Sequence, residues 1–494
     1  MALLGIDVGS SSCKAVVFDE HGRQLASGTC DYSLVRPEPN QAELDPDVLY
    51  AAVVAATRQA ATDRADEIEA LAVSSHGESF IPMGGDGKPT GRMVMNSDNR
   101  AVEQAARIER ELGRERIYAI TGSPPHAMFA LVKIMWQRER GMADAVKYLS
   151  AGDYILHRMG CGFLTDYSLA SRTMCFDINR KGWSRELLDA AGLTADHFPE
   201  PMPSGTVAGR LESGAAAELG LRRGVAVAAG GHDQPCGALG AGVIRAGEAS
   251  ISAGTYESVV IASDMAMNTP QSLRYSLNSY RHVVPDKFIT LAFFPGGMGV
   301  RWLIDELCQP EAWRAREEGR DVFSLLEEEQ LAYPGPTGIL VVPHWGGACT
   351  PYWDVSATGA VVGLTPACTR AKLYKAAYEG VACELAVNID VLESVAGRLS
   401  QLRISGGGAS SPFTVKLRAD IAGREMVILN TRETVCQGAA MLAGVGVGTF
   451  AGFEAAAESM LDVKEVVSPD AVEVAAYASQ RARYAKFVQD LLRR

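Results

Sequence analysis

Short apolar runs separated by turn-forming residues occupy the start of the chain. The segments 3–8 (LLGIDV) and 14–18 (KAVVF) have the length and composition of two β-strands that flank a polar loop, Gly9-Ser10-Ser11-Ser12. Glu20-His21-Gly22 marks the next turn, and 25–32 fits a third strand beside the first two. The pattern therefore predicts a three-stranded meander.

A helix is expected after the meander. Asp45-Pro46-Asp47 precedes an Ala-rich run, and a capping carboxylate with a proline in the first turn is typical of a helix start. The segment 69–74 is apolar and short enough for a buried strand, and 98–113 and 129–140 have helical patterns. Strands that alternate with helices in this way predict an α/β protein.

The same order of features begins again near the middle of the chain. The apolar run 249–252 leads into Ala253-Gly254-Thr255-Tyr256-Glu257-Ser258, and another apolar run, 259–262, follows. A Gly-hydroxyl turn also separates two apolar runs at the start of the chain, so this partial repeat indicates two related domains. We predict a first domain over 1–244 and a second over 245–494.

The polar loop between the first two predicted strands has the composition of a phosphate-binding turn. Such a turn requires N–H donors, hydroxyl groups and no bulky side chain. Gly9-Ser10-Ser11-Ser12 supplies these features, with Lys14 as an added charge, although an ordinary Ser-rich hairpin is the alternative. Asp7 favours the functional interpretation, because a carboxylate at the end of an apolar strand is unfavourable unless it is paired or assists a metal ion.

A second candidate, Gly230-Gly231-His232-Asp233-Gln234, follows the apolar run 225–229. Asp233 would lie beyond the carboxyl end of a strand, where open α/β sheets bind ligands. An aspartate there can act as the general base that a substrate hydroxyl needs, or it can cap the next helix. His232 is expected to be structural, because no second His or Cys stands at metal-ligand spacing.

The run Gly406-Gly407-Gly408 is a third candidate, between a predicted strand at 401–404 and a predicted helix from Phe413. Three glycines let a phosphate or a flat ligand contact the backbone at a helix N-terminus. Further along, the Ala-rich segment 454–486 predicts one or two terminal helices.

Composition limits the class of protein. Of the 494 residues, 47% are hydrophobic and 21% are charged, as in a globular enzyme. A net charge of −12 leaves no basic field for nucleic acid or anionic lipid, although backbone N–H groups can still hold phosphates. The ten cysteines are scattered without a C-x-x-C pair, and no apolar run has the length of a membrane helix. We expect a cytoplasmic protein that binds neither nucleic acid nor membrane.

These motifs, in this order, resemble those of the FGGY-type carbohydrate kinases, which belong to the sugar kinase, actin and Hsp70 fold group. The opening D-x-G-S-x-x-x-K, the pair Gly254-Thr255, GGHDQ and GGGAS carry the resemblance. Further segments similar to family motifs are 125–136 with Lys-x-x-Trp, 165–171, 294–302 and 359–379. The resemblance implies two RNase H-like (actin-like ATPase) domains with a catalytic cleft between them.

The resemblance also implies ATP and Mg²⁺ as cofactors. Asp233 would deprotonate a sugar hydroxyl, and Asp7 and Asp233 would hold the metal ion. The residues implied to surround the nucleotide are Gly9, Ser10, Ser11, Ser12, Lys14, Gly254, Thr255, Gly297, Met298, Arg301, Gly407, Gly408 and Ser411. Positioning and charge neutralisation dominate phosphoryl transfer, and these residue types supply both.

The implied substrate contacts belong mainly to the first domain. They are His76, Gly77, Glu78, Asn96, Asp98, Arg100, Met128, Asp233 and Gln234. His76-Gly77 is similar to part of a Met-His-Gly run of xylulokinases, whereas Asn96 stands where glycerol kinases have a tryptophan. We predict a kinase of a small sugar or polyol, with D-xylulose first and ribulose, an alditol such as erythritol or glycerol, and gluconate as alternatives.

The alternative from another class is an actin-type or Hsp70-type ATPase that switches partner binding. It would share the opening hairpin but would not need Glu78 or Asp98, and the segment 133–136 (KIMW) argues against it. Dimers are common in the family that the chain resembles, so a homodimer is a further expectation.

Overall fold

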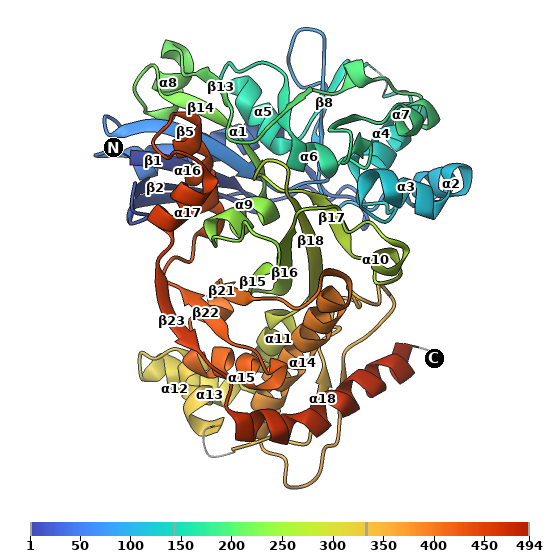
Figure 1. Cartoon of the computed structure of the whole chain (residues 1–494), viewed down its shortest axis with the longest axis vertical. Helices are drawn as coiled ribbons and strands as arrows, with labels where there is room; N and C mark the ends of the chain where they lie inside the picture. The colour runs from blue at the N-terminus through green and yellow to red at the C-terminus, as the bar shows by residue number, and fades with distance from the viewer. Residues whose placement is uncertain (1, 143, 331–333, 493–494) are drawn as a thin grey trace.

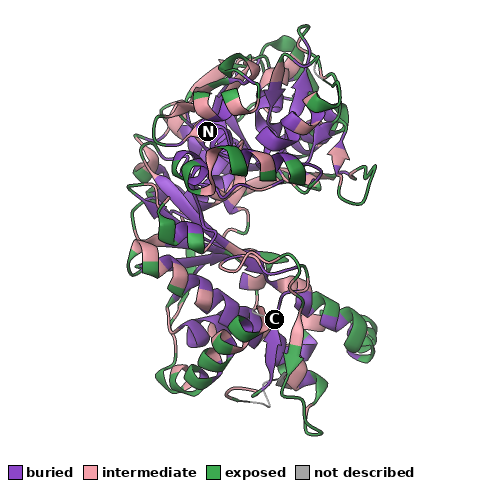
Figure 2. Cartoon of the chain, turned by 90° about the vertical axis from the view of Figure 1, so that its right-hand side faces the viewer, coloured by how far each residue is buried: buried purple, intermediate pink, exposed green. Residues whose placement is uncertain are grey.

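The chain folds into two lobes, and each lobe is built on one large mixed sheet with helices packed on it (Figure 1). The computed structural model describes residues 2–142, 144–330 and 334–492. Buried residues concentrate in the sheets and in the helix faces that cover them (Figure 2). The expected α/β class with two domains is confirmed.

The first lobe contains a six-stranded sheet. In spatial order its strands are β13 (Val207–Arg210), β14 (Ala226–His232), β5 (Ile68–Ser75), β1 (Ala2–Val8), β2 (Ser12–Asp19) and β3 (Gln24–Asp31). The antiparallel pairs β1–β2 and β2–β3 form the predicted meander, while β1, β5 and β14 are parallel. The carboxyl ends of these three parallel strands therefore meet at one edge of the sheet.

The second lobe repeats this topology in a seven-stranded sheet. Its strands are β17 (Asn278–Arg281), β18 (Phe288–Pro295), β16 (Tyr256–Ser263), β15 (Glu248–Ser252), β21 (Gln401–Ser405), β22 (Met426–Leu429) and β23 (Val463–Val467). As in the first sheet, β15, β16 and β18 form an antiparallel meander, and β15, β21 and β22 are parallel. The repeat near the middle of the sequence thus corresponds to a second copy of one sheet topology.

The helices of the first lobe include the three that the sequence predicts there. They are α1 (Pro46–Ala61), α2 (Val102–Leu112), α3 (Arg114–Thr121), α4 (Ala130–Glu139), α5 (Ala151–Arg158), α6 (Tyr167–Ser171), α7 (Arg185–Ala190), α8 (Ser213–Leu219) and α9 (Asp233–Gly240). Asp45 caps α1 by accepting from the Asp47 N–H, as expected. The helix expected from residue 98 begins only at Val102, because the residues before it form a polar loop.

Most remaining helices cover the second sheet. They are α10 (Pro270–Arg274), α11 (Gly297–Leu307), α12 (Gln309–Glu317), α13 (Val322–Gln330), α14 (Arg370–Ala396), α15 (Pro412–Ala422) and α18 (Ala471–Leu492). Of the one or two helices predicted over 454–486, the structure has two, α17 (Phe453–Met460) and α18, with β23 between them. This strand pairs only at the sheet edge and is largely exposed, so it lacks the apolar pattern of an inner strand.

Short two-stranded sheets complete the fold. The pairs are β4 (Glu43–Leu44) with β7 (Met93–Val94), β6 (Ile81–Met83) with β8 (Lys147–Leu149), β9 (Leu164–Asp166) with β12 (Glu200–Met202), β10 (Phe176–Asp177) with β11 (Gly182–Trp183), and β19 (Leu340–Val342) with β20 (Ala360–Val362). Over the described residues, no helix combines the length and the apolar character that crossing a membrane requires.

Two helices from the end of the chain pack on the first sheet. α16 (Thr434–Gly446) packs against β1, β5, β14 and α9, and α17 joins the same apolar cluster. A change of sheet falls between β14 and β15, near the predicted boundary of 244/245, which stays a prediction because 434–460 returns to the first lobe.

The contact between β1 and α16 depends on Gly5. A Cβ atom built there would lie 1.8 Å from the carbonyl oxygen of Cys436, and backbone atoms on both sides leave no room to yield. We predict that Gly5→Ala lowers the free energy of unfolding of the first lobe by about 3 kcal/mol, measured as a lower midpoint of thermal unfolding. Gly182→Ala is the matched control, because a Cβ there meets nothing within 4 Å. Equal midpoints for the two variants would contradict the close packing of α16 on β1.

Candidate active site

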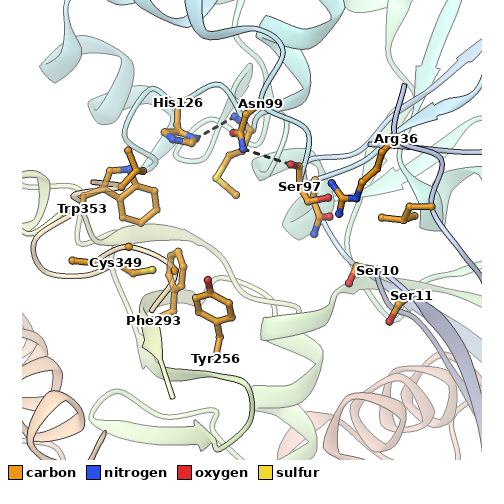
Figure 3. Close-up of a pocket in the computed structure, with 17 residues that line it drawn as sticks. Ser10, Ser11, Arg36, Ser97, Asn99, His126, Tyr256, Phe293, Cys349 and Trp353 are labelled. Atoms are coloured by element: carbon orange, nitrogen blue, oxygen red, sulfur yellow. Dashed lines mark hydrogen bonds between the residues drawn. The ribbon is translucent and has the colours of Figure 1, made fainter. Parts of the chain in front are cut away.

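A cavity of about 630 Å³ lies between the two lobes (Figure 3). The first lobe contributes polar residues to its wall, among them Ser10, Ser11, Asn96 and Asn99. The second lobe contributes the aromatic side chains Tyr256, Phe293 and Trp353, together with the backbone of 346–349. None of these second-lobe residues was predicted from the sequence, because a single aromatic residue in a strand or loop has no pattern that separates a cavity wall from a core.

The turn between β1 and β2 is tight, as the sequence predicts. The Gly9 N–H donates to the Ser12 carbonyl at 2.9 Å, and Ser10 and Ser11 are exposed at the cavity. The Tyr32 hydroxyl donates to the Gly9 carbonyl, and the Tyr32 N–H donates to the Ser11 carbonyl at 2.9 Å. Tyr32, at the end of β3, was not predicted; it fixes the turn from the neighbouring strand.

Asp7, near the end of β1, is a carboxylate without a complete set of partners. Its Oδ1 atom is buried and accepts no hydrogen bond from the described residues. Burial raises the pKa of Asp7 to about 7, although Lys14, directly opposite on β2, lowers it. The Lys14 ammonium is itself bonded to Glu433 at 2.8 Å, in front of α16. Glu433 was missed because it lies in a distant part of the chain.

Asp233 is the first residue of α9, directly after the end of β14. Its Oδ1 atom is buried and has no hydrogen-bond partner among the described residues, and it lies 3.2 Å from Nε2 of His232. Burial, together with the charges of Asp7 and Glu78, raises the pKa of Asp233 to about 8. These couplings place the three carboxylates near one another at the edge where the parallel strands end.

His232 has structural partners, in keeping with its predicted role. Its ring Nδ1 lies 3.0 Å from the Tyr280 hydroxyl of β17, and its N–H donates to the Ser168 hydroxyl at 2.8 Å. Gln234 also contacts the second lobe, since its side-chain oxygen accepts from the Ser258 hydroxyl at 3.0 Å. Residues that flank Asp233 thus connect the two sheets.

The segment 76–78 surrounds the carboxylates from the end of β5. Glu78 adopts a φ of +62°, a conformation rare outside glycine, and its carboxylate pairs with Arg172 at 2.5 Å. A Cβ at Gly77 would lie 2.8 Å from that arginine, so only glycine fits there without displacement. The His76 N–H donates to the Val8 carbonyl, while its buried Nε2 accepts and donates no bond among the described residues.

Arg172 is a site residue that the sequence did not reveal. It is buried, donates to the Ser123 hydroxyl and to the Asn278 side-chain oxygen at 3.2 Å each, and lies over the Tyr280 ring. Arg172 follows directly after the predicted motif 165–171, and its place next to that motif was the one feature of the sequence that could have indicated a site residue.

The predicted sugar-contact segment 96–100 divides into two groups. Asn96 lines the cavity, as does Met128. Asp98 and Arg100 do not line it: Asp98 is fully buried and accepts from the Ala42 N–H at 2.7 Å and from Arg100 at 2.7 Å. Asp98 and Arg100 stabilise the loop on its side away from the cavity, and neither of them is exposed at the cavity wall.

The Lys-x-x-Trp segment of α4 supports the same loop. Lys133 is fully buried and donates to the Met95 carbonyl at 2.6 Å, next to Asn96. Burial lowers the pKa of Lys133 to about 7, and the charges of Asp98 and Glu78 oppose that shift. The ring of Trp136 lies under the guanidinium groups of Arg100 and Arg140. The motif therefore positions the cavity wall.

Three of the segments expected to border the nucleotide converge on one turn of the second lobe. The Gly297 N–H donates to the Gly254 carbonyl at 2.8 Å, and the Met298 N–H donates to the Thr255 carbonyl at 3.2 Å. From the glycine run, the Gly408 N–H donates to the Ala253 carbonyl at 3.0 Å. The helix α11 begins at Gly297, and a short 3₁₀ helix, η2 (Gly407–Ala409), precedes α15. Because the first N–H groups of a helix have no partner within the helix, N–H groups of both segments face the turn at 253–255.

Two other predicted nucleotide residues have partners within the protein. Arg301 pairs with Asp305 at 3.0 Å on the exposed side of α11, and the Ser411 hydroxyl caps α15 by accepting from the Thr414 N–H. Their predicted contacts with the nucleotide stay predictions.

The residues fit a Mg²⁺ ion with few protein ligands. The described residues contain no group of three or more His, Cys, Asp and Glu side chains that would form a protein-only metal site. The buried, unpartnered oxygens of Asp7 and Asp233 suit Mg²⁺, which binds through one or two carboxylates and the phosphates of a substrate.

The repeated sheet and the cavity between the lobes define a two-lobed α/β protein of the actin-like ATPase fold. Residues 2–240 match the N-terminal domain and residues 249–447 match the C-terminal domain of the FGGY family of carbohydrate kinases, so the chain belongs to this family. The family resemblance and the enzyme class that the motifs predicted are confirmed.

Relatives of known name differ in their substrates. The chain is 28% identical to a gluconokinase of Bacillus subtilis over 92% of this chain and 90% of that protein. It is also 28% identical to a xylulose kinase of Staphylococcus epidermidis over 95% of this chain and 92% of that protein. The solved structure of a Plasmodium falciparum glycerol kinase with ADP has the same fold, with a TM-score of 0.86 and 20% identity over 99% and 98% of the two chains.

The raised pKa of Asp233 makes stability depend on pH. Between about pH 4 and pH 8 the folded protein keeps a proton that the unfolded chain has released, so the free energy of unfolding falls as pH rises. We predict that Asp233→Asn raises the melting temperature of the ligand-free protein, by more at pH 8 than at pH 5. The exposed Asp189→Asn is the control and should show no such trend. A difference that shrinks with rising pH would contradict the raised pKa.

Proposed function

We propose that the protein transfers the γ-phosphoryl group of ATP to a hydroxyl of a small sugar, sugar acid or polyol, with Asp233 as the general base. The observation that carries this proposal is the pair of carboxylates, Asp7 and Asp233, whose buried Oδ1 atoms accept no hydrogen bond from the described residues at the edge where β1 and β14 end. Family membership supplies the reaction class. Similarity in fold to a glycerol kinase solved with ADP supports the nucleotide.

Asp233 has the properties that a base for a hydroxyl requires. Its raised pKa, about 8, makes the ionised carboxylate a stronger base than an exposed aspartate, and near neutral pH part of the population is ionised. The α9 N-terminus and the contact of His232 with Tyr280 hold the carboxylate in place. Proton removal from the substrate hydroxyl is therefore assigned to this one carboxylate.

The chain offers two turns for the phosphates. The first lobe offers the N–H groups and hydroxyls of Gly9 to Ser12 after β1, and the second lobe offers the corresponding Gly254-Thr255 turn after β15. Mg²⁺ held by Asp7 and Asp233 would neutralise negative charge on the phosphates. Lys14 adds a positive charge beside Asp7, although it shares that charge with Glu433.

Glu78 and Arg172 position the substrate side. Arg172 neutralises the Glu78 carboxylate through Oε1 and is itself held by Ser123 and Asn278, so the second oxygen of Glu78 is the one that would accept from a substrate hydroxyl. Asn96 presents a buried side-chain oxygen without a partner among the described residues, which suits a second hydroxyl.

The candidate substrates are D-xylulose, which the sequence ranks first, then ribulose, an alditol and gluconate. Equal identity to a gluconokinase and to a xylulose kinase gives neither candidate an advantage. Location in the cytoplasm and a homodimer also stay predictions.

The general-base assignment predicts a selective loss of activity. Asp233→Ala should lower kcat by about 10²–10⁴-fold, because proton removal in the transition state contributes a factor of this size. The Kd for ADP, measured by titration calorimetry, should change by less than about threefold, since nucleotide contacts come mainly from the second lobe. The control, Asp189→Asn, should match the unaltered protein. Near-normal turnover of Asp233→Ala would exclude the base role.

The kinase and the ATPase switch differ in their dependence on substrate. We predict that ADP release, followed with a coupled assay over a panel of ketoses, alditols and sugar acids, rises at least tenfold with one member of the panel. A rate that stays constant over the whole panel would favour the ATPase switch and would contradict the proposed function.

A further inference from the structure

The described residues that line the cavity between the lobes carry a single formal charge, and it is positive. Among the described residues that line it, Arg36 is the one with a formal charge. His126 also lines the cavity, but burial lowers its pKa, so its ring is neutral near pH 7. A protein with a net charge of −12 therefore has a cavity wall whose charge is positive.

Arg36 differs from the other arginines near the site. Arg100 pairs with Asp98 and Glu43, and Arg172 pairs with Glu78. Arg36, in the loop after β3, forms no hydrogen bond or ion pair with any side chain in the described ranges and is exposed to solvent. Figure 3 shows its guanidinium pointing toward Ser97 at the cavity wall.

The remaining polar groups on this side of the cavity are neutral. Asn96, Ser97 and Asn99 provide amides and a hydroxyl, and the buried Asn96 oxygen has no partner among the described residues. Neutral groups of this kind suit the hydroxyls of any polyol. A neutral ketose or alditol would leave the charge of Arg36 unused, whereas a carboxylate would match its planar, two-pronged donors.

We infer that the substrate of this kinase is a sugar acid, a polyhydroxylated carboxylate whose anionic end pairs with Arg36 while one of its hydroxyls faces Asp233. This inference rests on the proposed function and narrows it to one class among the candidate substrates. The positive charge also offsets repulsion between the incoming carboxylate and the acidic residues Asp7, Glu78 and Asp233. A phosphate oxygen of the nucleotide is the other anion that Arg36 can meet, because Ser10 and Ser11 line the same cavity.

A matched set of substrates tests the inference. The full chain with ATP and Mg²⁺ is assayed for ADP release with aldonates of four to six carbons, with the alditols of the same lengths, with D-xylulose and with ribulose. D-Gluconate, D-glucitol and D-gluconamide form the sharpest comparison, since they differ only at the terminal group. We expect kcat/KM for one aldonate to exceed that of its alditol and amide at least tenfold, which corresponds to 1.4 kcal/mol.

Variants of Arg36 separate the two anions. Arg36→Gln should lower kcat/KM for the aldonate at least tenfold, mainly through KM, and leave the neutral substrates and the KM for ATP unchanged. Arg36→Lys should restore part of the loss, because it keeps the charge without the planar fork. The exposed Arg185→Gln is the control, and melting temperatures confirm that each variant is folded.

The contrary outcomes are equally distinct. A preference for a ketose or alditol over every aldonate would overturn the inference while leaving the kinase function intact. A loss in Arg36→Gln that is equal for neutral and acidic substrates, with a raised KM for ATP, would assign Arg36 to the phosphates and would also overturn it. Absence of substrate-dependent ADP release would count against the proposed function itself.

Discussion

Two carboxylates, Asp7 and Asp233, each have a buried Oδ1 atom that accepts no hydrogen bond from the described residues, and this is the constraint on which the rest of the site depends. Burial of a carboxylate is unfavourable and is the main cause of the raised pKa of each group, and the charge of Asp7 adds to the raised pKa of Asp233. The fold accepts this cost because parallel strands β1 and β14 must end at the same edge of the sheet. In the proposed function, a metal ion and the phosphates of the nucleotide would neutralise these carboxylates, and binding of such ligands would stabilise the folded protein.

The use of one sheet topology in both lobes follows from the same constraint. Phosphoryl transfer requires charge to be neutralised on more than one side, and each copy of the topology supplies one polar turn after its first strand. The lobes are not independent: α16 returns to the first sheet and places Glu433 against Lys14, while Tyr280 of the second sheet contacts His232. These long-range contacts link the position of the lobes to the geometry around Asp233.

Substrate specificity depends on other residues than the reaction does. Elements that end at the sheet edge carry Asp7 and Asp233, the groups proposed for phosphoryl transfer, whereas loops carry Arg36, Asn96 and Trp353 of the cavity wall. Loops tolerate substitution because little is packed against them. Relatives of equal identity can therefore share a reaction and differ in substrate, as the gluconokinase and the xylulose kinase do.

The sequence by itself determined the meander, the main strands and helices, and the turns after β1 and β15, because short apolar runs and glycine-hydroxyl turns are local signals. It did not reveal Tyr32, Arg172, Glu433 or Trp353, and it grouped Asp98 with Asn96 although only the asparagine lines the cavity. Only the tertiary structure decided these matters. Burial, ion-pair partners and the direction of a side chain depend on segments far apart in the chain, and no local pattern encodes which of them meet.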